Sequence, residues 1–304
     1  MSAPTVQSPT VEVVVAGSSD TPGTPPTVYR GNTRRRPGRL REWGIRVAVL
    51  AAAAGVWQFL TANDVELWAK FSTVPSVTEI ADAFGASLSS ATYYKDVAQS
   101  VIRIASGFVL AVAVGVPLGI ALGRSQAASL SLGTLTEVVR PIPAIALVPI
   151  AILILPTDEV GIVFITFIAA FFPILVATRH AVRALPTIWE DSVRTMGGTR
   201  SDVITRVVLP GIAPGVFSGV SVGIGVSWIC LISAEMISGQ FGIGYRTWQA
   251  YTVVDYRQVF VGMITIGVLG ALTSGGIELL GRRITHWLPR AEENLNEVVK
   301  PQRG

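Results

Sequence analysis

The residues that could do chemistry are scattered along the chain and form no catalytic spacing. Cys230 is the single cysteine and stands in an apolar run, so it can form no disulfide within the chain and is expected to be a small buried hydrophobic residue. His180 and His286 are isolated and flanked by basic residues. No Ser-His-Asp arrangement, pair of catalytic carboxylates or metal-ligand spacing can be argued. We therefore expect no enzyme activity, metal or cofactor on this chain.

Ionisable and aromatic residues inside apolar segments are the remaining candidates, because charge is rare there without a function. Glu137 and Arg140 are three residues apart on one helix face, either as a structural ion pair, which we favour, or as part of a substrate path. Glu235 ends an apolar run, where it either caps a helix, meets a partner or lines that path. Trp228 either lines the path or packs in the interior. We take Arg140, Pro143, Trp228 and Glu235 as the candidate translocation path.

The composition places these residues in a membrane protein. Half of the 304 residues are hydrophobic and 14% are charged, whereas soluble domains carry about 25% charged residues. The net charge of +4 would suit nucleic acid or anionic lipid. Because the positive residues fall at the ends of apolar segments, we favour lipid and expect no nucleic acid.

Six apolar segments approach the roughly 20 residues that cross a bilayer core. They are residues 45–62, 101–123, 135–155, 158–179, 214–236 and 259–281. Residues 63–100 are mixed, and we expect one or two interfacial helices there, one opened by Pro75. With a cytoplasmic N-terminus, 19 of the 24 lysines and arginines lie inside, as the positive-inside rule requires. The five outside are Lys70, Lys95, Arg103, Arg246 and Arg257.

These segments predict an all-α polytopic membrane protein of about six transmembrane helices with both termini in the cytoplasm. Residues 1–44 are expected to be a disordered basic tail, 45–287 the transmembrane domain and 288–304 a C-terminal tail. The basic run RGNTRRRPGRLREWGIR is interpreted as a topogenic anchor in preference to a DNA-binding arm. No apolar run near the start resembles an ordinary signal peptide.

Two sets of three glycines recur at every fourth position inside the second and fifth segments. Such spacing lets helix backbones approach closely in lipid, where apolar surfaces gain little by associating. The pattern does not tell whether the partner helix belongs to the same chain. The sets are Gly115, Gly119 and Gly123, and Gly215, Gly219 and Gly223.

The third segment is rich in proline, with Pro141, Pro143, Pro149 and Pro156. Each proline removes a backbone donor and tends to kink a helix. Irregular backbone at membrane depth survives only inside protein or beside a water-filled cavity. We therefore expect this segment to be interior and near a pathway, and Pro173 to kink the fourth segment.

A polar loop, residues 181–213, separates the fourth and fifth segments. Thr187 and Glu190 have capping-box spacing, and Thr199 and Asp202 repeat it. The spacing predicts two short helices, over residues 188–196 and 200–208.

The ends of these two helices are also marked. Gly197 and Gly198 are expected to end the first, because a left-handed backbone costs glycine little. Leu209-Pro210 is expected to end the second. The exposed charges of this helix–turn–helix are Asp191, Arg194, Arg200, Asp202 and Arg206.

The loop could read DNA, act as a structural lid or dock a cytoplasmic partner. A loop tethered at both ends to bilayer spans cannot easily enter a major groove. We therefore favour docking, with a lid as the alternative.

The stretch DSVRTMGGTRSDVITRVVLP resembles the EAA loop of ABC-importer permeases. That loop has Glu-Ala-Ala, a glycine at the seventh position, an aliphatic residue ten further on and then x-Leu-Pro. The corresponding positions here are Asp191, Ser192 and Val193, followed by Gly197, Val207, Leu209 and Pro210. The departure at the first three positions is mild, since an acid is kept and two small residues are replaced.

Further stretches resemble the nitrate/sulfonate/taurine branch of these permeases, over roughly residues 45–287. They include VGVPLGIALGRS, RPIPAIALVPIAIL, FFPILVATRHAVR and SWICLISAEMISGQFGIGYRTWQA. One departure is ILPTDEVG, where the family usually has a Trp-Phe-Gly-like turn.

The resemblance implies the type I ABC importer permease fold in a bacterial plasma membrane. It implies a homodimer that works with a cytoplasmic ATPase dimer, which binds ATP and Mg, and with an extracytoplasmic solute-binding protein. This chain has no G-x-x-x-x-G-K-[ST] of its own. The implied cargo is a small anion: an alkanesulfonate, taurine or nitrate. The implied ATPase-coupling residues are Asp191, Arg194, Gly197, Gly198, Arg200, Val207, Leu209 and Pro210.

Three alternatives remain. A permease of the same branch could carry a vitamin precursor or another small solute. An ion-driven secondary transporter would usually show internal repeats, and none is convincing here. A non-transporting scaffold would not need the interior prolines or the docking loop.

Overall fold

A computed structural model describes residues 11–14, 28–31, 39–63 and 74–287. These residues divide into two units, of which the larger runs from Val56 to His286 and holds every site discussed below. In the smaller unit, β1 (Val11–Val14) pairs antiparallel with β2 (Val28–Gly31). The strands interrupt the N-terminal tail for which the sequence predicts disorder. The remainder of that tail, and residues 288–304, lie outside the described residues.

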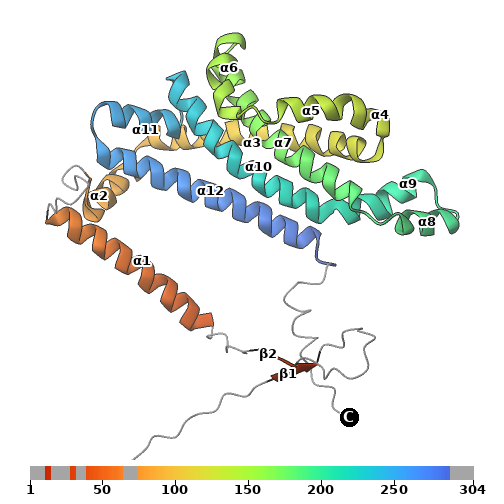
Figure 1. The fold of residues 1–304 in the computed structure, drawn as a ribbon. Coiled ribbons are helices and arrows are strands. Elements are labelled where there is room, and N and C mark those ends of the chain that lie inside the picture. The colour runs from red at the N-terminus through yellow and green to blue at the C-terminus, as the bar shows by residue number, and fades with distance from the viewer. Residues whose placement is uncertain (1–10, 15–27, 32–38, 64–73, 288–304) are drawn as a thin grey trace, which may run out of the picture. The chain divides into compact units, whose positions relative to one another are not determined.

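The described part of the larger unit is helical. Its long helices are the end of α1 (Arg39–Ala62), α3 (Ala91–Arg124), α7 (Asp158–Arg183), α10 (Leu209–Ser238) and α12 (Tyr256–Ile284). Across all the described residues, five stretches of helix are long and apolar enough to cross a membrane, and a sixth span results if one bent pair is counted. The shorter α2 (Val77–Leu88) and α11 (Ile243–Thr252) lie at one end of the bundle, and α8 (Thr187–Thr195) and α9 (Arg200–Val203) at the other (Figure 1).

The region before the second predicted span differs from expectation. α2 begins where Ser76 and Glu79 form a capping box, close to Pro75 as predicted. α3, however, starts at Ala91, so the expected interfacial helices do not reach residue 100. At 1.5 Å per residue its 34 residues extend about 51 Å, beyond a bilayer core of about 30 Å. Several polar residues in its first turns are buried within the bundle, among them Asp96, Ser100 and Arg103.

Both glycine sets pack against α7, so the partner helix lies in the same chain. A Cβ on Gly119 of α3 would lie 2.6 Å from the Thr178 Cβ atom, and one on Gly219 of α10 would lie 2.5 Å from the Ala177 Cβ atom. Neither position has room for a side chain. The two sets therefore hold α3 and α10 close to α7, which is the central helix of the bundle.

The proline-rich third segment is broken. Residues 126–154, which include most of it, form α4 (Gln126–Ala128), the π-helical turn η2 (Ser129–Gly133), α5 (Thr134–Val139), the 3-10 turn η3 (Ala144–Leu147) and α6 (Val148–Ile154). The helical stretches on the two sides of Arg140–Pro143 meet at 80°. The predicted irregularity is thus a sharp bend, because Pro141 and Pro143 supply no backbone donors there. By contrast, α7 runs on through Pro173 as one helix.

Candidate functional site

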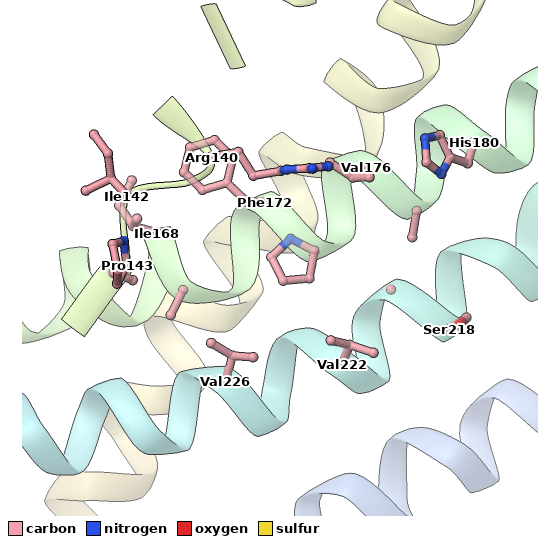
Figure 2. A pocket seen from close by; sticks show the side chains of 15 residues that line it. Arg140, Ile142, Pro143, Ile168, Phe172, Val176, His180, Ser218, Val222 and Val226 are labelled. Carbon is pink, nitrogen blue, oxygen red and sulfur yellow. The ribbon is translucent and has the colours of Figure 1, made fainter. Parts of the chain in front are cut away.

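A cavity of about 540 Å³ lies between α7, α10 and the bend of the third segment. Its walls are apolar, with Phe172 and Val176 from α7 and Val222 and Val226 from α10 among the lining residues. Figure 2 shows these side chains around the opening. We call it the Arg140 cavity. The bend places irregular backbone beside a cavity, as the prolines led us to expect.

The polar side chains that line the Arg140 cavity include no carboxylate. Arg140 and His180 both line it, and Ser218 adds a hydroxyl. In Figure 2 the Arg140 side chain extends along α7 in the direction of His180. Glu137 pairs with Arg179 at 2.9 Å rather than with Arg140. Arg140 therefore faces the cavity with its charge uncompensated by the neighbour that the sequence suggested.

Two of the four predicted path residues line this cavity and two do not. Arg140 and Pro143 belong to its lining. Trp228 is buried, and its indole nitrogen donates to the Thr273 hydroxyl at 2.9 Å, which matches the packing alternative. Glu235 is completely buried in another part of the bundle.

Glu235 belongs to a group of side chains that we call the Arg103 cluster: the buried Ser100, Arg103 and Glu235, and the half-buried Glu159. Arg103 donates from Nε to Glu159 Oε2 at 2.8 Å and from Nη1 to Glu235 Oε1 at 2.9 Å. Its Nη2 donates to the second oxygen of Glu159. Ser100 and the Gly244 backbone amide also donate to Glu235. The cluster joins α3, α7, α10 and the start of α11.

The cluster could not be recognised from the sequence, because its members lie far apart in the chain. A signal was present, however. Arg103 is one of five cations on the proposed outer side, and it stands at the start of an apolar segment. A cation in that position needs an acidic partner.

The polar loop forms the first short helix predicted, and a second helix begins at Arg200 as predicted. The turn between them is left-handed at Gly197, with φ of +82°. The second predicted capping box is present, since Thr199 and Asp202 bond reciprocally. Gly198 lies against Val193, where an added Cβ would be 2.5 Å from a methyl carbon. Two glycines in succession thus set the angle between α8 and α9.

The start of α8 differs from prediction. Pro186 is its cap, and Thr187 is already helical without a capping bond. Glu190 instead accepts two hydrogen bonds from Arg124 at the end of α3, at 2.7 and 2.9 Å. These bonds hold the pKa of the Glu190 carboxyl below its usual value. A carboxylate paired with a guanidinium gains more than one that closes a capping box.

The prediction that Leu209-Pro210 ends the second helix is wrong. α9 continues through the π-helical turn η4 (Ile204–Val208) into α10, so helix extends from Arg200 to Ser238. Pro210 cannot donate to the preceding turn and would crowd its carbonyl in a regular helix. A π turn just before it relieves both problems. Val207 lies half-buried within that turn.

The outer face of the loop is exposed and partly apolar. Ile188, Trp189 and Met196 are 64%, 51% and 78% exposed, and Asp191 is exposed beside them. Val203 and Val208 are buried on the opposite side against α7 and α10. A second cavity, of about 550 Å³, opens between α3, α8 and α9, and three arginines line it: Arg124, Arg194 and Arg200.

Several apolar spans packed through glycines, a cavity among them and a polar helical loop at one end define a membrane transport subunit. The chain belongs to the family of inner membrane components of binding-protein-dependent transport systems, whose model matches residues 115–286. The resemblance to ABC-importer permeases is confirmed, and the chain is a transporter subunit rather than an enzyme.

Individual proteins that are similar to this chain are also named as permeases. A probable ABC transporter permease protein of Brucella abortus is 31% identical, over 83% of this chain and 99% of that protein. The nitrate import permease protein NrtB of Leptolyngbya laminosa is 28% identical, over 76% and 83%. The putative aliphatic sulfonates transport permease protein SsuC of Bacillus subtilis is 27% identical, over 87% and 95%.

Among solved structures, the MetNI methionine ABC transporter in an inward-facing conformation is similar to this chain. The TM-score is 0.52 at 20% identity, over 65% of this chain and 96% of that one. This likeness shows the type I ABC importer permease fold.

Proposed function

We propose that this permease subunit carries a small anion, with a nitrate or sulfonate group, through the Arg140 cavity by alternating access. The lining of that cavity carries the proposal. It offers the guanidinium of Arg140 and the imidazole of His180, no carboxylate, and apolar walls. A guanidinium presents paired donors that match planar or tetrahedral oxyanions. Relatives named for nitrate and aliphatic sulfonates support the same class of cargo.

Energy enters through the α8–α9 loop in this proposal. The loop docks onto a separate ATPase subunit, which binds ATP and Mg. Ile188, Trp189 and Met196 would be covered by that partner, and Asp191, Arg194 and Arg200 would meet its polar groups. Gly197 and Gly198 fix the angle, while Val207, Leu209 and Pro210 transmit movement because the loop helix is continuous with α10. Closure of two ATPases would then switch the permease between two arrangements.

The rest of the assembly is part of the same proposal. Two copies of the chain form a homodimer in a bacterial plasma membrane, with both termini in the cytoplasm. An extracytoplasmic binding protein delivers the cargo to the α2–α11 end. A permease for a vitamin precursor or other small solute is the alternative within this family.

The cargo is tested by uptake in cells that express the chain together with its transport partners. Labelled taurine, ethanesulfonate and nitrate are offered to the wild type and to Arg140→Ala, Arg140→Lys and Arg282→Ala. Arg282 is the control, because it pairs with Glu278 on the exposed end of α12. We expect Arg140→Ala to reduce uptake of one of these anions at least about tenfold, the equivalent of about 1.4 kcal/mol. Arg140→Lys should retain more uptake than Arg140→Ala, and Arg282→Ala should resemble the wild type. Unchanged anion uptake in Arg140→Ala would contradict the proposal.

A further inference from the structure

The Arg103 cluster lies beyond the Arg140 cavity, on the same two helices that form its walls. Along the chain, Ile168 is the first lining residue on α7 and Val226 the last on α10. Glu159 precedes Ile168 by nine positions, and Glu235 follows Val226 by nine. At a rise of 1.5 Å per residue, both carboxylates lie about 13 Å further along their helices. The cluster therefore spans both cavity walls at one level, toward the α2–α11 end of the bundle.

Arg103, on α3, connects the two walls. Its guanidinium binds both oxygens of Glu159 on α7 and, through Nη1, Glu235 on α10. The same nitrogen donates to the Phe241 carbonyl at 2.6 Å. Arg103 therefore also binds the backbone of the segment that joins α10 to α11. α7 and α10 cannot separate at this level unless one of the two ion pairs breaks.

The two ion pairs differ in how easily they can break. The Glu235 side chain is 0% exposed, whereas that of Glu159 is 42% exposed. If Glu159 leaves, water can hydrate its carboxylate, and Arg103 keeps Glu235 as a counter-ion. If Glu235 lost Arg103, a buried carboxylate would remain without its cation, which is far more costly. The Glu159 contact is therefore the releasable one.

We propose that Arg103 and Glu159 form the releasable contact of a clamp that closes the Arg140 cavity toward the α2–α11 end, and that the cavity opens on that side when the contact parts. Arg103 is then a positioning residue, which acts on the helices and does not touch the cargo. The inference rests on the proposed role of the Arg140 cavity as the substrate path.

Thiol accessibility tests the clamp in the full chain in its own membrane. Cys230 is the only native cysteine and is buried. In a Cys230→Ala background, Val226→Cys places a thiol in the cavity wall. A membrane-impermeant maleimide is then added to intact cells and, separately, to inverted membrane vesicles. We expect Glu159→Gln to speed labelling of the Val226→Cys thiol at least about threefold from the membrane side at which the α2–α11 end lies. Loss of the Glu159 charge shifts the population toward the arrangement that is open on that side.

Two controls separate a clamp from general loosening. Asp158→Asn removes the neighbouring acid, which accepts a hydrogen bond from Gln240 at 2.5 Å and does not bind Arg103. It should label at the wild-type rate. Glu159→Gln with Cys230 retained and no introduced thiol should stay unlabelled, because the core around Cys230 remains packed.

Equal labelling rates with and without Glu159→Gln would overturn the clamp. Labelling of the native Cys230 in Glu159→Gln would also overturn it, since the residue would then only hold the bundle together. Either result alongside Arg140-dependent anion uptake would remove the clamp and leave the proposed function intact. Conversely, accelerated labelling together with unchanged uptake in Arg140→Ala would support a gate while contradicting the assigned path.

Discussion

The interior of the helix bundle and the α8–α9 loop treat charged and aromatic side chains in opposite ways. Around the α2–α11 end, Arg103 and Glu235 are 1% and 0% exposed and satisfy each other within the chain. At the α8–α9 end, Trp189 and Met196 are more than half exposed, and Arg200 is exposed beside a cavity. The buried charges of the interior are paired within this chain. The loop leaves apolar and charged side chains exposed, as a surface that docks a partner requires.

The largest effect is expected where a buried charge would lose its counter-ion. Arg103→Ala leaves Glu235 buried without a cation and should cost about 5 kcal/mol of folding free energy. Thermal unfolding in detergent and the yield of monodisperse protein measure this loss. Arg257→Ala is the matched control, because Arg257 is exposed and only 3.6 Å from Asp255. It should change stability by less than about 1 kcal/mol. Equal stability of Arg103→Ala and Arg257→Ala would show that the buried Glu235 does not depend on Arg103 as its counter-ion.

Two tryptophans make the same comparison without charge. Trp228→Ala empties a buried position and should cost about 3 kcal/mol. Trp189→Ala should leave unfolding unchanged, because that ring is 51% exposed. Its effect should instead appear as lower retention of the ATPase during purification. If Trp189→Ala unfolds the protein as readily as Trp228→Ala, the α8–α9 face is part of the fold rather than a docking surface.

The smallest effect concerns the bond between Glu190 and Arg124, which holds α8 to the end of α3. The pKa of Glu190 is lowered in the folded state, so this stabilisation is present above the ordinary glutamate value of about 4.3 and is lost as the pH falls through the folded-state pKa. At pH 7, Glu190→Gln should weaken the local structure by about 1 kcal/mol. Hydrogen exchange of the α8 amides measures it, with Asp191→Asn as the control.

The pH dependence of this exchange difference can contradict the prediction. The difference in exchange between Glu190→Gln and the wild type should stay constant from about pH 5 to 8 and shrink under more acidic conditions. A difference that grows as the pH falls would mean that the Glu190 carboxylate does not stabilise the loop.

Features set by local spacing were predictable from the sequence. The glycine sets follow a four-residue period, and any helix that carries them needs a closely packed partner. The left-handed turn at Gly197 and the box of Thr199 and Asp202 are equally local. The family resemblance followed from the same stretch of residues.

Features set by contacts across the fold were not predictable. Glu190 has capping-box spacing with Thr187, yet it pairs with Arg124, 66 residues away in sequence. Pro210 predicts the end of a helix, but the π turn of residues 204–208 lets the helix continue through it. Arg103 and Glu235 are 132 residues apart. Only the packing of α3, α7 and α10 brings these groups together.

The central claim is that the α8–α9 loop couples this permease to an ATPase, and Gly197 offers the most direct test. A Cβ atom at Gly197 would meet no atom within 4 Å, but the φ of +82° strains any residue other than glycine, by about 1–2 kcal/mol. Gly197→Val should therefore reach the membrane at a near-normal level, with α8 re-aimed relative to α9. Co-purification of the ATPase, quantified per permease, is the measurement, with Gly225→Ala as the control because that helical site is open and has no positive φ. We expect a strong loss for Gly197→Val, a smaller one for Asp191→Ala and none for Gly225→Ala. Wild-type retention of the ATPase by Gly197→Val would contradict the account.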